Sequence, residues 1–359
     1  MKNIVISTGG SGGHVKPAIA LYEYLEKDNK VFITTDKRGL MYLKNYYSKY
    51  KIINLTKLNF NFFKIIQFVG SFIYSLIQSI FFLSQKKINI VISTGGYMSL
   101  PVCIAAKIIN IKIYLLEPNQ VLGRSNLFFL KHCEKILTYE EDIKNFPKKL
   151  KQKIVKLKPL MKKDIFNIKN NVNKRKKFSI LIIGGSQAAL KFDELFNEAL
   201  SKLSKEHDIF IYHQTSKDNE NNLKNFYTKH GIDHEVFFFK ENLYEIFINC
   251  NFAITRAGAS TINELVFLRV PFLAIPFPYA KDDHQFFNAE YYFKKNMCWL
   301  KREKEINSEI LYDFLGNLIK NKNFIDEKKR NMIEFNKLNF WDHNLKILKK
   351  IFNNENKSW

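Results

Sequence analysis

Arginine and acidic residues are scarce in this chain of 359 residues. Only seven of its 57 basic residues are arginines, and the acidic residues number 34, so the formal net charge is +23. Proteins that read nucleic acids depend on arginine for bidentate contacts to bases, and no nucleic-acid motif occurs here. The lysine surplus also fits a coding bias toward A and T, because Asn, Ile and Phe are abundant too. We therefore expect no nucleic-acid partner, and we expect an anionic membrane surface or anionic substrates.

Cysteine is scarce as well, and the four cysteines, Cys103, Cys133, Cys250 and Cys298, are far apart. No CxxC pair or Cys/His spacing of a zinc site occurs, and a disulfide framework is unusual in a chain of this length. The N-terminus enters a β-branched run and a glycine turn at once, without the unbroken apolar stretch of a signal peptide. These absences predict a reducing compartment.

Short β-branched runs alternate with helical patterns, which is typical of parallel α/β sheets. Residues 144–177 interrupt this order with 14 basic residues and one acid, Asp164, and we expect a solvated connector there. The sequence thus predicts two Rossmann-like α/β domains, residues 1–158 and 159–340, whose parallel sheets face a central cleft at the carboxyl ends of the strands. A C-terminal helix, residues 341–359, is expected to pack back on the first domain. The expected strands are Asn3–Ser7, Val31–Thr35, Ile52–Leu55, Ile88–Ser93, Ile111–Leu116, Lys135–Thr138, a run from Phe178, Ile209–His213, Val236–Phe239, Phe252–Thr255, Phe272–Ile275 and Met297–Leu300.

The segment 64–87 carries no charge from Ile65 to Gln85, which is the length of a membrane span. Its polar residues recur at helical spacing, and this indicates an amphipathic helix rather than a span. The opposite, apolar face belongs either to the core or to a membrane-docking surface, with lysines at both ends near anionic headgroups. The polar stripe consists of Gln67, Ser71, Ser75 and Gln78.

Three glycine turns each follow an expected strand and open a helix, at Thr8–His14, Thr94–Ser99 and Gly184–Ala189. Glycine permits positive φ and a close approach of the backbone, and the first N–H groups of a helix attract an anion. None of the three is the GxGxxG fingerprint or a P-loop. Together they predict phosphate binding, although a tight strand–helix turn needs glycine anyway.

The octapeptide NIVISTGG occurs twice, at Asn3–Gly10 and at Asn89–Gly96. Similarity ends after each copy, so we interpret the pair as one local structure used twice and not as a duplicated domain. In a doubly wound sheet the first and fourth strands are neighbours at the switch point. The sequence therefore predicts that the two copies lie side by side.

Polar residues gather after several expected strands. His14 stands at a helix start, which disfavours imidazolium and keeps the ring available as a base or donor; a structural role is the alternative. Residues 117–126 suit a hydroxyl-rich ligand or form a capped loop. Glu264 is either the capping-box partner of Thr261 or an acceptor for a ribose diol. His284 and Gln285 begin a further helix.

Six of these motifs occur in the order GGSGGHVKPAIAL, TGGYMSLP, EPNQVLGRSN, GGSQ, TRAGASTINE and PFPYAKDDHQFFNA. In this order they resemble the MurG family of bacterial glycosyltransferases, and the match spans about residues 3–295. The resemblance implies a GT-B architecture and an inverting transfer of GlcNAc from UDP-GlcNAc to the 4-hydroxyl of MurNAc in undecaprenyl-diphosphate-MurNAc-pentapeptide (lipid I), which gives lipid II of peptidoglycan. It also implies a peripheral location on the cytoplasmic face of the plasma membrane.

The same resemblance implies roles for single residues. Ser11, Gly12 and Gly13 would line the acceptor diphosphate, with His14 as the base and Glu117 as its competitor. Around the sugars would lie Tyr97, Glu117, Asn119 and Asn126. The donor would contact Ser186, Gln187, Arg256, Ala259, Ser260, Thr261, Ile262, Asn263, Glu264, His284 and Gln285. Because no Asp-x-Asp pair stands in the donor loops, we expect no essential metal and no cofactor.

Some positions depart from the family pattern. Ala188 and Leu100 replace glycines, and the arginine of the domain junction is absent from Leu157–Met161, where Lys162 or Lys163 would substitute. Lysine is a point charge and not a planar fork, so weaker donor binding is expected. Two other interpretations remain at this point. One is a different enzyme of the same architecture, a nucleotide-sugar epimerase or another lipid glycosyltransferase, and the other is a non-catalytic scaffold.

Overall fold

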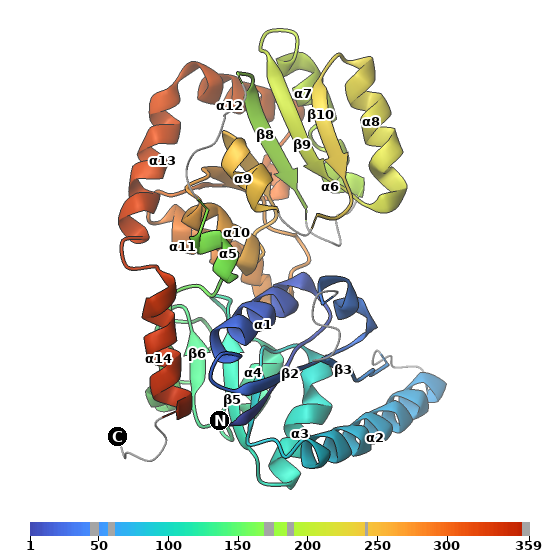
Figure 1. Ribbon diagram of the computed structural model, residues 1–359. Coiled ribbons are helices and arrows are strands. Elements are labelled where there is room, and N and C mark those ends of the chain that lie inside the picture. The colour runs from blue at the N-terminus through green and yellow to red at the C-terminus, as the bar shows by residue number, and fades with distance from the viewer. Residues whose placement is uncertain (44–49, 57–61, 169–175, 185–189, 241–242, 354–359) are drawn as a thin grey trace. The chain divides into compact units, whose positions relative to one another are not determined.

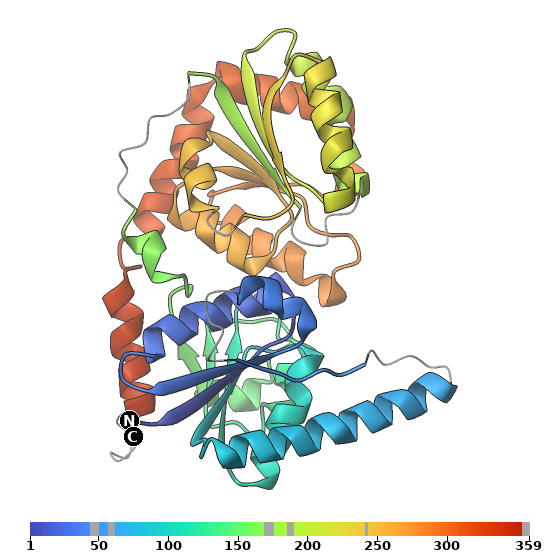
Figure 2. The same ribbon diagram turned by 45° about the vertical axis from the view of Figure 1, so that its right-hand side comes forward.

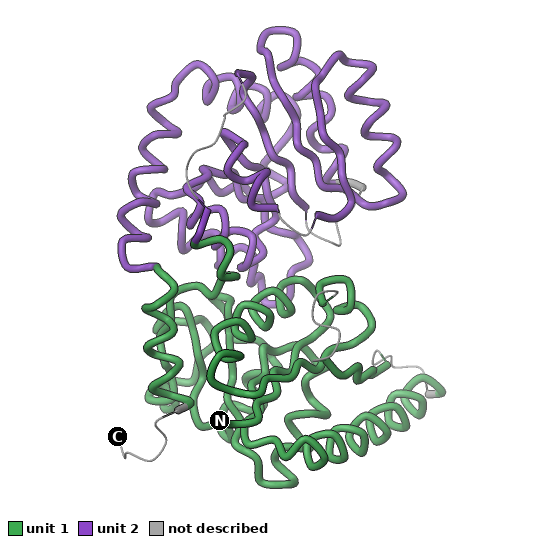
Figure 3. The backbone as a smooth tube through the Cα atoms, viewed as in Figure 1, with its two compact units in different colours: residues 1–166, 340–359 green, residues 167–339 purple. Residues whose placement is uncertain are grey.

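The computed structural model describes residues 1–43, 50–56, 62–168, 176–184, 190–240 and 243–353. The chain divides into two compact units (Figure 3). Unit 1 comprises Met1–Phe166 and Phe340–Trp359, and unit 2 comprises Asn167–Asn339. In sequence, unit 2 is therefore inserted between two segments of unit 1, and unit 1 continues past residue 158.

Unit 1 contains a seven-stranded sheet with the order β3-β2-β1-β4-β5-β6-β7, and all its strand pairs are parallel (Figure 1). Apolar runs form these strands because a parallel sheet is covered on both faces. The strands are β1 (Asn3–Ser7), β2 (Lys30–Thr35), β3 (Tyr50–Ile52), β4 (Ile90–Ser93), β5 (Lys112–Glu117), β6 (Ile136–Thr138) and β7 (Ile154–Lys156).

Helices cover both faces of this sheet. Ile4 and Ile6 of β1 belong to a core formed with α1 and α14, and Val5 points into the opposite core, formed with α2, α3 and α4. The alternation follows from the two-residue period of a strand. The helices of unit 1 are α1 (Gly12–Leu25), α2 (Phe62–Gln85), α3 (Leu100–Ile108), α4 (Arg124–Phe129), α5 (Lys163–Phe166) and α14 (Trp341–Asn353).

Unit 2 contains a six-stranded parallel sheet with the order β10-β9-β8-β11-β12-β13. One face packs on α6, α7, α8 and α12, and the other on α9, α10, α11 and α13. The strands are β8 (Phe178–Ile183), β9 (Ile209–Gln214), β10 (Asp233–Phe237), β11 (Phe252–Thr255), β12 (Phe272–Ala274) and β13 (Trp299–Leu300). The helices are α6 (Leu190–Glu194), α7 (Asn197–Leu203), α8 (Glu220–Lys229), α9 (Tyr244–Asn249), α10 (Ala259–Phe267), α11 (His284–Phe293), α12 (Ser308–Lys320) and α13 (Lys322–Phe335).

The prediction of two parallel α/β sheets is confirmed, and so is the pairing of the two octapeptides. β1 pairs with β4 in register, with Ile4 opposite Ile90 and Ser7 opposite Ser93. The four cysteines are buried free thiols. These outcomes follow from apolar patterning, which is strong in strands buried on both faces.

The prediction of a solvated connector over 144–177 is wrong for its first part, up to Phe166, and residues 169–175 lie outside the described residues. β7 lies within this stretch and pairs with β6, and Leu157 and Leu160 belong to the core of unit 1. The short apolar run was hidden by the lysines around it, whose long side chains reach solvent from a sheet edge. Met161, at the position of the absent junction arginine, is also buried.

The strand expected at Ile52–Leu55 ends early, at Ile52. The chain then turns to α2, where the Ser75 hydroxyl donates to the Asn54 carbonyl oxygen at 2.5 Å and the Thr56 hydroxyl lies 2.8 Å from the Ser71 hydroxyl. These bonds replace the hydrogen bonds of a longer strand.

α2 turns its serines inward and much of its apolar surface outward. Ser75 and Ser79 are buried, whereas Ile73 is 51% exposed and Phe81 is 67% exposed. The segment Phe63–Gln85 is long and apolar enough to cross a membrane, and 17% of its most apolar 18-residue stretch is buried. Figures 1 and 2 show the first turns of α2 extending beyond the sheet of unit 1. The interpretation of the apolar face as plain core is therefore wrong for its exposed members.

Candidate active site

The glycine turns after β1 and β4 touch each other at the carboxyl end of the unit 1 sheet. A Cβ atom on Gly9 would lie 3.5 Å from the Gly96 Cα. Gly95 and Gly96 have φ values of 88° and 80°, a region that side chains strongly disfavour. The two copies of the octapeptide thus form one continuous glycine surface where two strands end.

His14, in the first turn of α1, lies against this surface. A Cβ atom on Gly95 would lie 3.4 Å from His14 Cε1, and one on Gly96 would lie 3.4 Å from His14 Cδ2. His14 Nδ1 lies 2.8 Å from the Thr94 carbonyl oxygen. A carbonyl oxygen only accepts hydrogen bonds, so Nδ1 carries the proton and the lone pair of the neutral ring is on Nε2.

Glu117, at the end of β5, holds the following loop together. Its Oε1 accepts from the Asn119 backbone N–H at 3.2 Å and from the Asn119 amide at 2.9 Å. Its Oε2 accepts from the Gly123 N–H at 2.8 Å and from the Asn126 amide at 3.0 Å. The buried carboxylate is thus satisfied by four donors. Asn126 also lies beside Gly95, whose Cβ would be 3.4 Å from the Asn126 Nδ2.

Asp36 and Arg38, which follow β2, also lie at this site. The sequence did not predict them as site residues. A Cβ atom on Gly10 would lie 1.7 Å from Asp36 Oδ1 and 2.8 Å from Arg38 Cβ, so only glycine fits there. The Arg38 guanidinium carbon lies 6.0 Å from the centroid of the Tyr97 ring. Ser11 is the N-cap of α1 and makes no side-chain capping bond, and no acidic residue stands in the first turn.

In unit 2, Arg256 follows β11 and joins several strand ends. Its Nη1 donates to the carbonyl oxygens of Ile275 and Pro276 at 3.3 and 3.2 Å, and its Nη2 lies 2.6 Å from Glu303 Oε2. The guanidinium carbon lies 4.0 Å from the centroid of the Phe192 ring. Burial lowers the pKa of Arg256, and the Glu303 carboxylate opposes that effect. Arg256 therefore clamps the loops after β11, β12 and β13.

The turn that opens α10 lies next to this clamp. The N-cap of α10 is Gly258, so Thr261 stands inside the helix and the capping-box interpretation of Glu264 is wrong. The Ser260 hydroxyl is buried without a hydrogen-bond partner. The Asn263 amide oxygen accepts from the Tyr292 hydroxyl at 2.5 Å. The structure thus brings together at one helix start the predicted donor residues Ala259, Ser260, Thr261, Ile262, Asn263 and Glu264.

α11 begins beside the same sheet edge. The Gln285 amide oxygen accepts from the Phe277 N–H at 2.9 Å, and His284 Nδ1 donates to the Lys281 carbonyl oxygen at 2.8 Å. Asp282 and Asp283, just before them, have φ values of 53° and 51°. Such backbone in two successive non-glycine residues stores strain, which is often found at functional sites. The other two predicted donor residues, Ser186 and Gln187, lie outside the described residues.

A buried polar network lies behind the Arg256 clamp, in α6 and β9. Asp193 accepts from the Thr215 hydroxyl at 2.6 Å and from the Asn219 amide at 2.9 Å, and its Oδ1 lies 3.3 Å from His213 Nε2. Burial raises the pKa of Asp193, but these hydrogen bonds outweigh burial and the pKa lies below its usual value. Asp193 thus fixes α6, which carries Phe192.

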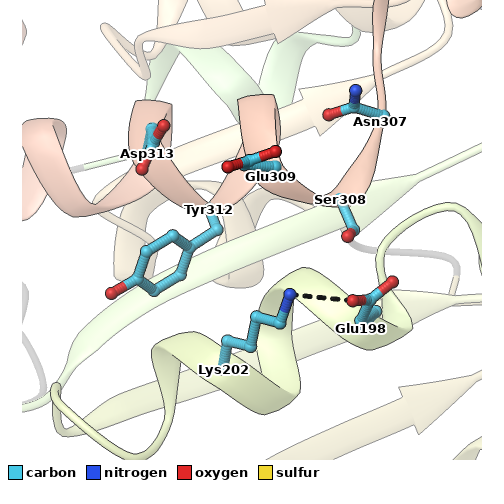
Figure 4. Close-up of a pocket in the computed structure, with 7 residues that line it drawn as sticks. All are labelled: Glu198, Lys202, Asn307, Ser308, Glu309, Tyr312 and Asp313. Carbon is cyan, nitrogen blue, oxygen red and sulfur yellow. Dashed lines mark ion pairs between the residues drawn. The ribbon is translucent and has the colours of Figure 1, made fainter.

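Elsewhere in unit 2, α7 and α12 border a polar hollow (Figure 4). Its lining includes the ion pair of Lys202 with Glu198, at 2.8 Å, and the carboxylates of Glu309 and Asp313. It contains none of the predicted site residues. Within the part of the chain that the structure describes, no group of three His, Cys, Asp or Glu side chains is arranged to hold a metal ion.

Comparison with known families places both units. Residues 4–138 match the glycosyltransferase family 28 N-terminal domain, and residues 179–343 match the glycosyltransferase family 28 C-terminal domain. In fold, the chain is similar to the crystal structure of Acinetobacter baumannii MurG, with a TM-score of 0.74 and 22% identity over 98% of this chain and 100% of that one.

Full-length relatives carry a more specific name. A protein of Pelagibacter ubique is 44% identical over 356 residues, which is 99% of each chain, and one of Rickettsia felis is 31% identical over 93% of this chain and 95% of its own. Both are named UDP-N-acetylglucosamine–N-acetylmuramyl-(pentapeptide) pyrophosphoryl-undecaprenol N-acetylglucosamine transferase. The chain therefore belongs to glycosyltransferase family 28 and, within it, to the MurG group.

Proposed function

We propose that this protein transfers GlcNAc from UDP-GlcNAc to the 4-hydroxyl of MurNAc in lipid I, with inversion at the anomeric carbon, and so forms lipid II for peptidoglycan. The observation that carries the proposal is the 44% identity, over 99% of both chains, to a relative named for this transfer. The reaction is a hexosyl transfer and needs a base at the attacking hydroxyl and donors at the leaving diphosphate.

His14 is the base in this proposal. The hydrogen bond from Nδ1 to the Thr94 carbonyl oxygen fixes the ring and puts the lone pair on Nε2, which takes the proton of the sugar hydroxyl as the glycosidic bond forms. The position of His14 in the first turn of α1 favours the neutral ring. Gly95 and Gly96 let the acceptor approach because no side chain covers the ring there.

Glu117 is a positioning residue in this proposal. Four N–H donors already occupy its two oxygens, so the carboxylate is committed to the loop and not to the substrate. It shapes the loop that presents Asn119 and Asn126 to the sugars. Ser11, Gly12 and Gly13 would take the acceptor diphosphate at the start of α1, and Tyr97 would border it.

Unit 2 would bind the donor at the carboxyl ends of its strands. The first turn of α10, together with Ser186 and Gln187, would stabilise the leaving UDP, and Glu264 would accept from the ribose hydroxyls. Arg256 supports this site through the loops it clamps. His284 and Gln285 at the start of α11 would face the GlcNAc.

We also propose that unit 1 docks on the cytoplasmic face of the plasma membrane through α2. Its exposed apolar side chains follow helical spacing, and the serines of the other side bind the protein, so the helix lies in the membrane surface without crossing it. The net charge of +23 favours anionic lipid. The apolar face consists of Phe63, Ile66, Ile73, Tyr74, Ile77 and Phe81, which are 51–79% exposed.

One assay tests the reaction. The purified protein is incubated with UDP-GlcNAc and a short-chain lipid I analogue, and UDP release and disaccharide are both measured. Formation of the disaccharide in step with UDP supports the transfer. Epimerised nucleotide sugar without disaccharide would identify an epimerase, and no consumption of UDP-GlcNAc would identify a non-catalytic scaffold.

A further inference from the structure

The few arginines of this chain are concentrated where strands end. Three of the seven stand within three residues of a strand end: Arg38 after β2, Arg256 after β11 and Arg302 after β13. Almost all the other basic residues of the chain are lysines. Arginine differs from lysine in its planar fork, which binds carboxylates and phosphates through two parallel bonds. An arginine at these positions therefore points to a need for the fork and not only for the charge.

Two of these forks have clear protein partners. Arg256 is buried and binds two carbonyl oxygens and Glu303, and Arg302 pairs with Asp283 at 2.7 Å. Arg38 differs, because 46% of its side chain is exposed although Asp36 holds it. The exposed part lies where the turn after β1 and the turn after β4 meet, next to Gly10 and Tyr97.

Asp36 engages only one edge of the Arg38 guanidinium. Its Oδ2 accepts from Nε at 2.8 Å and from Nη2 at 2.5 Å, and its Oδ1 accepts from the backbone N–H groups of Arg38 and Gly39 at 3.1 and 3.3 Å. The carboxylate is itself almost fully buried. The Tyr97 side chain is a further hydrogen-bond partner of the guanidinium. The N–H groups on the second edge of the fork, those of Nη1 and the remaining one of Nη2, have the geometry that takes two oxygens of a phosphate.

We propose that Arg38 binds the diphosphate of the acceptor through this second edge, and that Asp36 is the residue that positions it. The proposal rests on the proposed function, because it assigns a new binding residue for that acceptor. The start of α1 and Arg38 are in contact through Gly10, so one diphosphate spans both. Burial of Asp36 restrains the fork before the ligand arrives, which reduces the ordering cost of binding.

The test compares Arg38→Lys and Asp36→Asn with the wild type, using a short-chain lipid I analogue and a second analogue in which a single phosphate replaces the diphosphate. Asparagine keeps an oxygen for the N–H groups of Arg38 and Gly39 but loses the charge that fixes the fork. Arg330→Lys, at an exposed site on α13, is the matched control. Steady-state kinetics give the KM of each substrate, and calorimetric titration gives the Kd of the diphosphate analogue without turnover.

We expect Arg38→Lys to raise the acceptor KM and Kd by about tenfold, the scale of one charge-assisted hydrogen bond, and to leave the UDP-GlcNAc KM within about twofold. Asp36→Asn should give a smaller rise in the same constants, and the monophosphate analogue should reduce the effect of both variants. Unchanged acceptor KM and Kd in Arg38→Lys would overturn the proposal. Binding without transfer in the wild type would instead refute the proposed function alone, and the absence of binding in the wild type would refute both.

Discussion

In the proposed mechanism, the chemistry of unit 1 depends on His14. Its Nδ1 proton is committed to the Thr94 carbonyl oxygen, so only Nε2 can accept a proton from substrate. We expect His14→Ala to lower kcat by about a hundredfold or more, the usual scale for the loss of an acid–base group, with a small change in the UDP-GlcNAc KM. Steady-state kinetics with the lipid I analogue measure both constants.

Glu117→Gln is the matched comparison for that variant. Glutamine keeps one oxygen for the N–H donors around it, so a positioning role predicts a fall in kcat that is much smaller than the fall in His14→Ala. We also expect a lower melting temperature, because the two N–H groups that donate to the other oxygen lose their acceptor. If Glu117→Gln lost more activity than His14→Ala, the roles of the two residues would be reversed.

The gathering of candidate residues at one sheet edge could be predicted, because the carboxyl ends of parallel strands meet there. His14, in the first turn of α1, and Glu117, at the end of β5, lie at that edge, and their roles stay predictions. Asp36 and Arg38 also follow a strand of this sheet. The sequence did not single them out, because an ion pair between residues two apart gives no periodic pattern. Asn288, one turn after His284 on α11, is buried, and its amide donates to the Ala257 carbonyl oxygen at 3.2 Å. Its direction depends on tertiary packing that no sequence pattern records.

At the scale of elements, the Asp193 network joins α6 to β9 and gives a pH dependence. The native pKa of Asp193 is below the value of about 3.9 expected for the unfolded chain, so its stabilisation is complete above that value and is lost as the pH falls through the native pKa. We expect Asp193→Asn to lower the melting temperature clearly at neutral pH, and the effect to shrink progressively as the pH falls below about 3.9. Thermal unfolding from neutral pH to below that value measures the difference, with the exposed Asp326→Asn as control. A difference that did not change with pH would contradict a charged Asp193.

α2 is the element whose surface is most unusual. We expect the double substitution Ile73→Ser and Phe81→Ser to weaken binding to phosphatidylglycerol vesicles by about tenfold or more, because each side chain that enters lipid contributes on the order of 1.5 kcal/mol or more. Both residues are exposed, so the fold should be retained. Vesicle sedimentation measures the binding, and Ile310→Ser, at an exposed site on α12, is the control. Equal binding of the double variant would place membrane contact elsewhere.

The elements themselves were largely predictable, because strands buried on both faces are apolar and short and their helices have clear periods. The errors share one cause. At β7 and α2 the local composition indicates an environment that differs from the one in the folded protein. At β7, lysines surround a short apolar edge strand, so the stretch looks solvated. In α2, a serine stripe packs inward because a backbone oxygen of a neighbouring segment accepts a hydrogen bond from Ser75. Sequence periodicity shows that a helix has two faces, and it does not show which face meets protein.

At the scale of the whole molecule, the last helix belongs to the first unit. The Tyr24 and Trp341 rings stack with centroids 3.6 Å apart, and Leu348 and Phe352 are fully buried against α1 and the sheet of unit 1. We expect Leu348→Ala to destabilise unit 1 by about 2–5 kcal/mol, the usual cost of such a cavity. Limited proteolysis with mass spectrometry should find the first cuts in unit 1. The exposed Lys346→Ala is the control, and first cuts in unit 2 would contradict this assignment.

Unit 2 is an insertion in unit 1, and this has a consequence for how the protein is made. The ribosome releases residues 1–166 first, yet their hydrophobic core is complete only when residues 340–359 emerge. Domains fold as units during synthesis, so unit 2 can reach its native state while the earlier unit still waits for its last helix. The first unit to be synthesised therefore cannot complete its core until the end of the chain has been made. A message truncated near its end would yield a finished unit 2 attached to an open unit 1, a product that cellular proteases would be expected to remove.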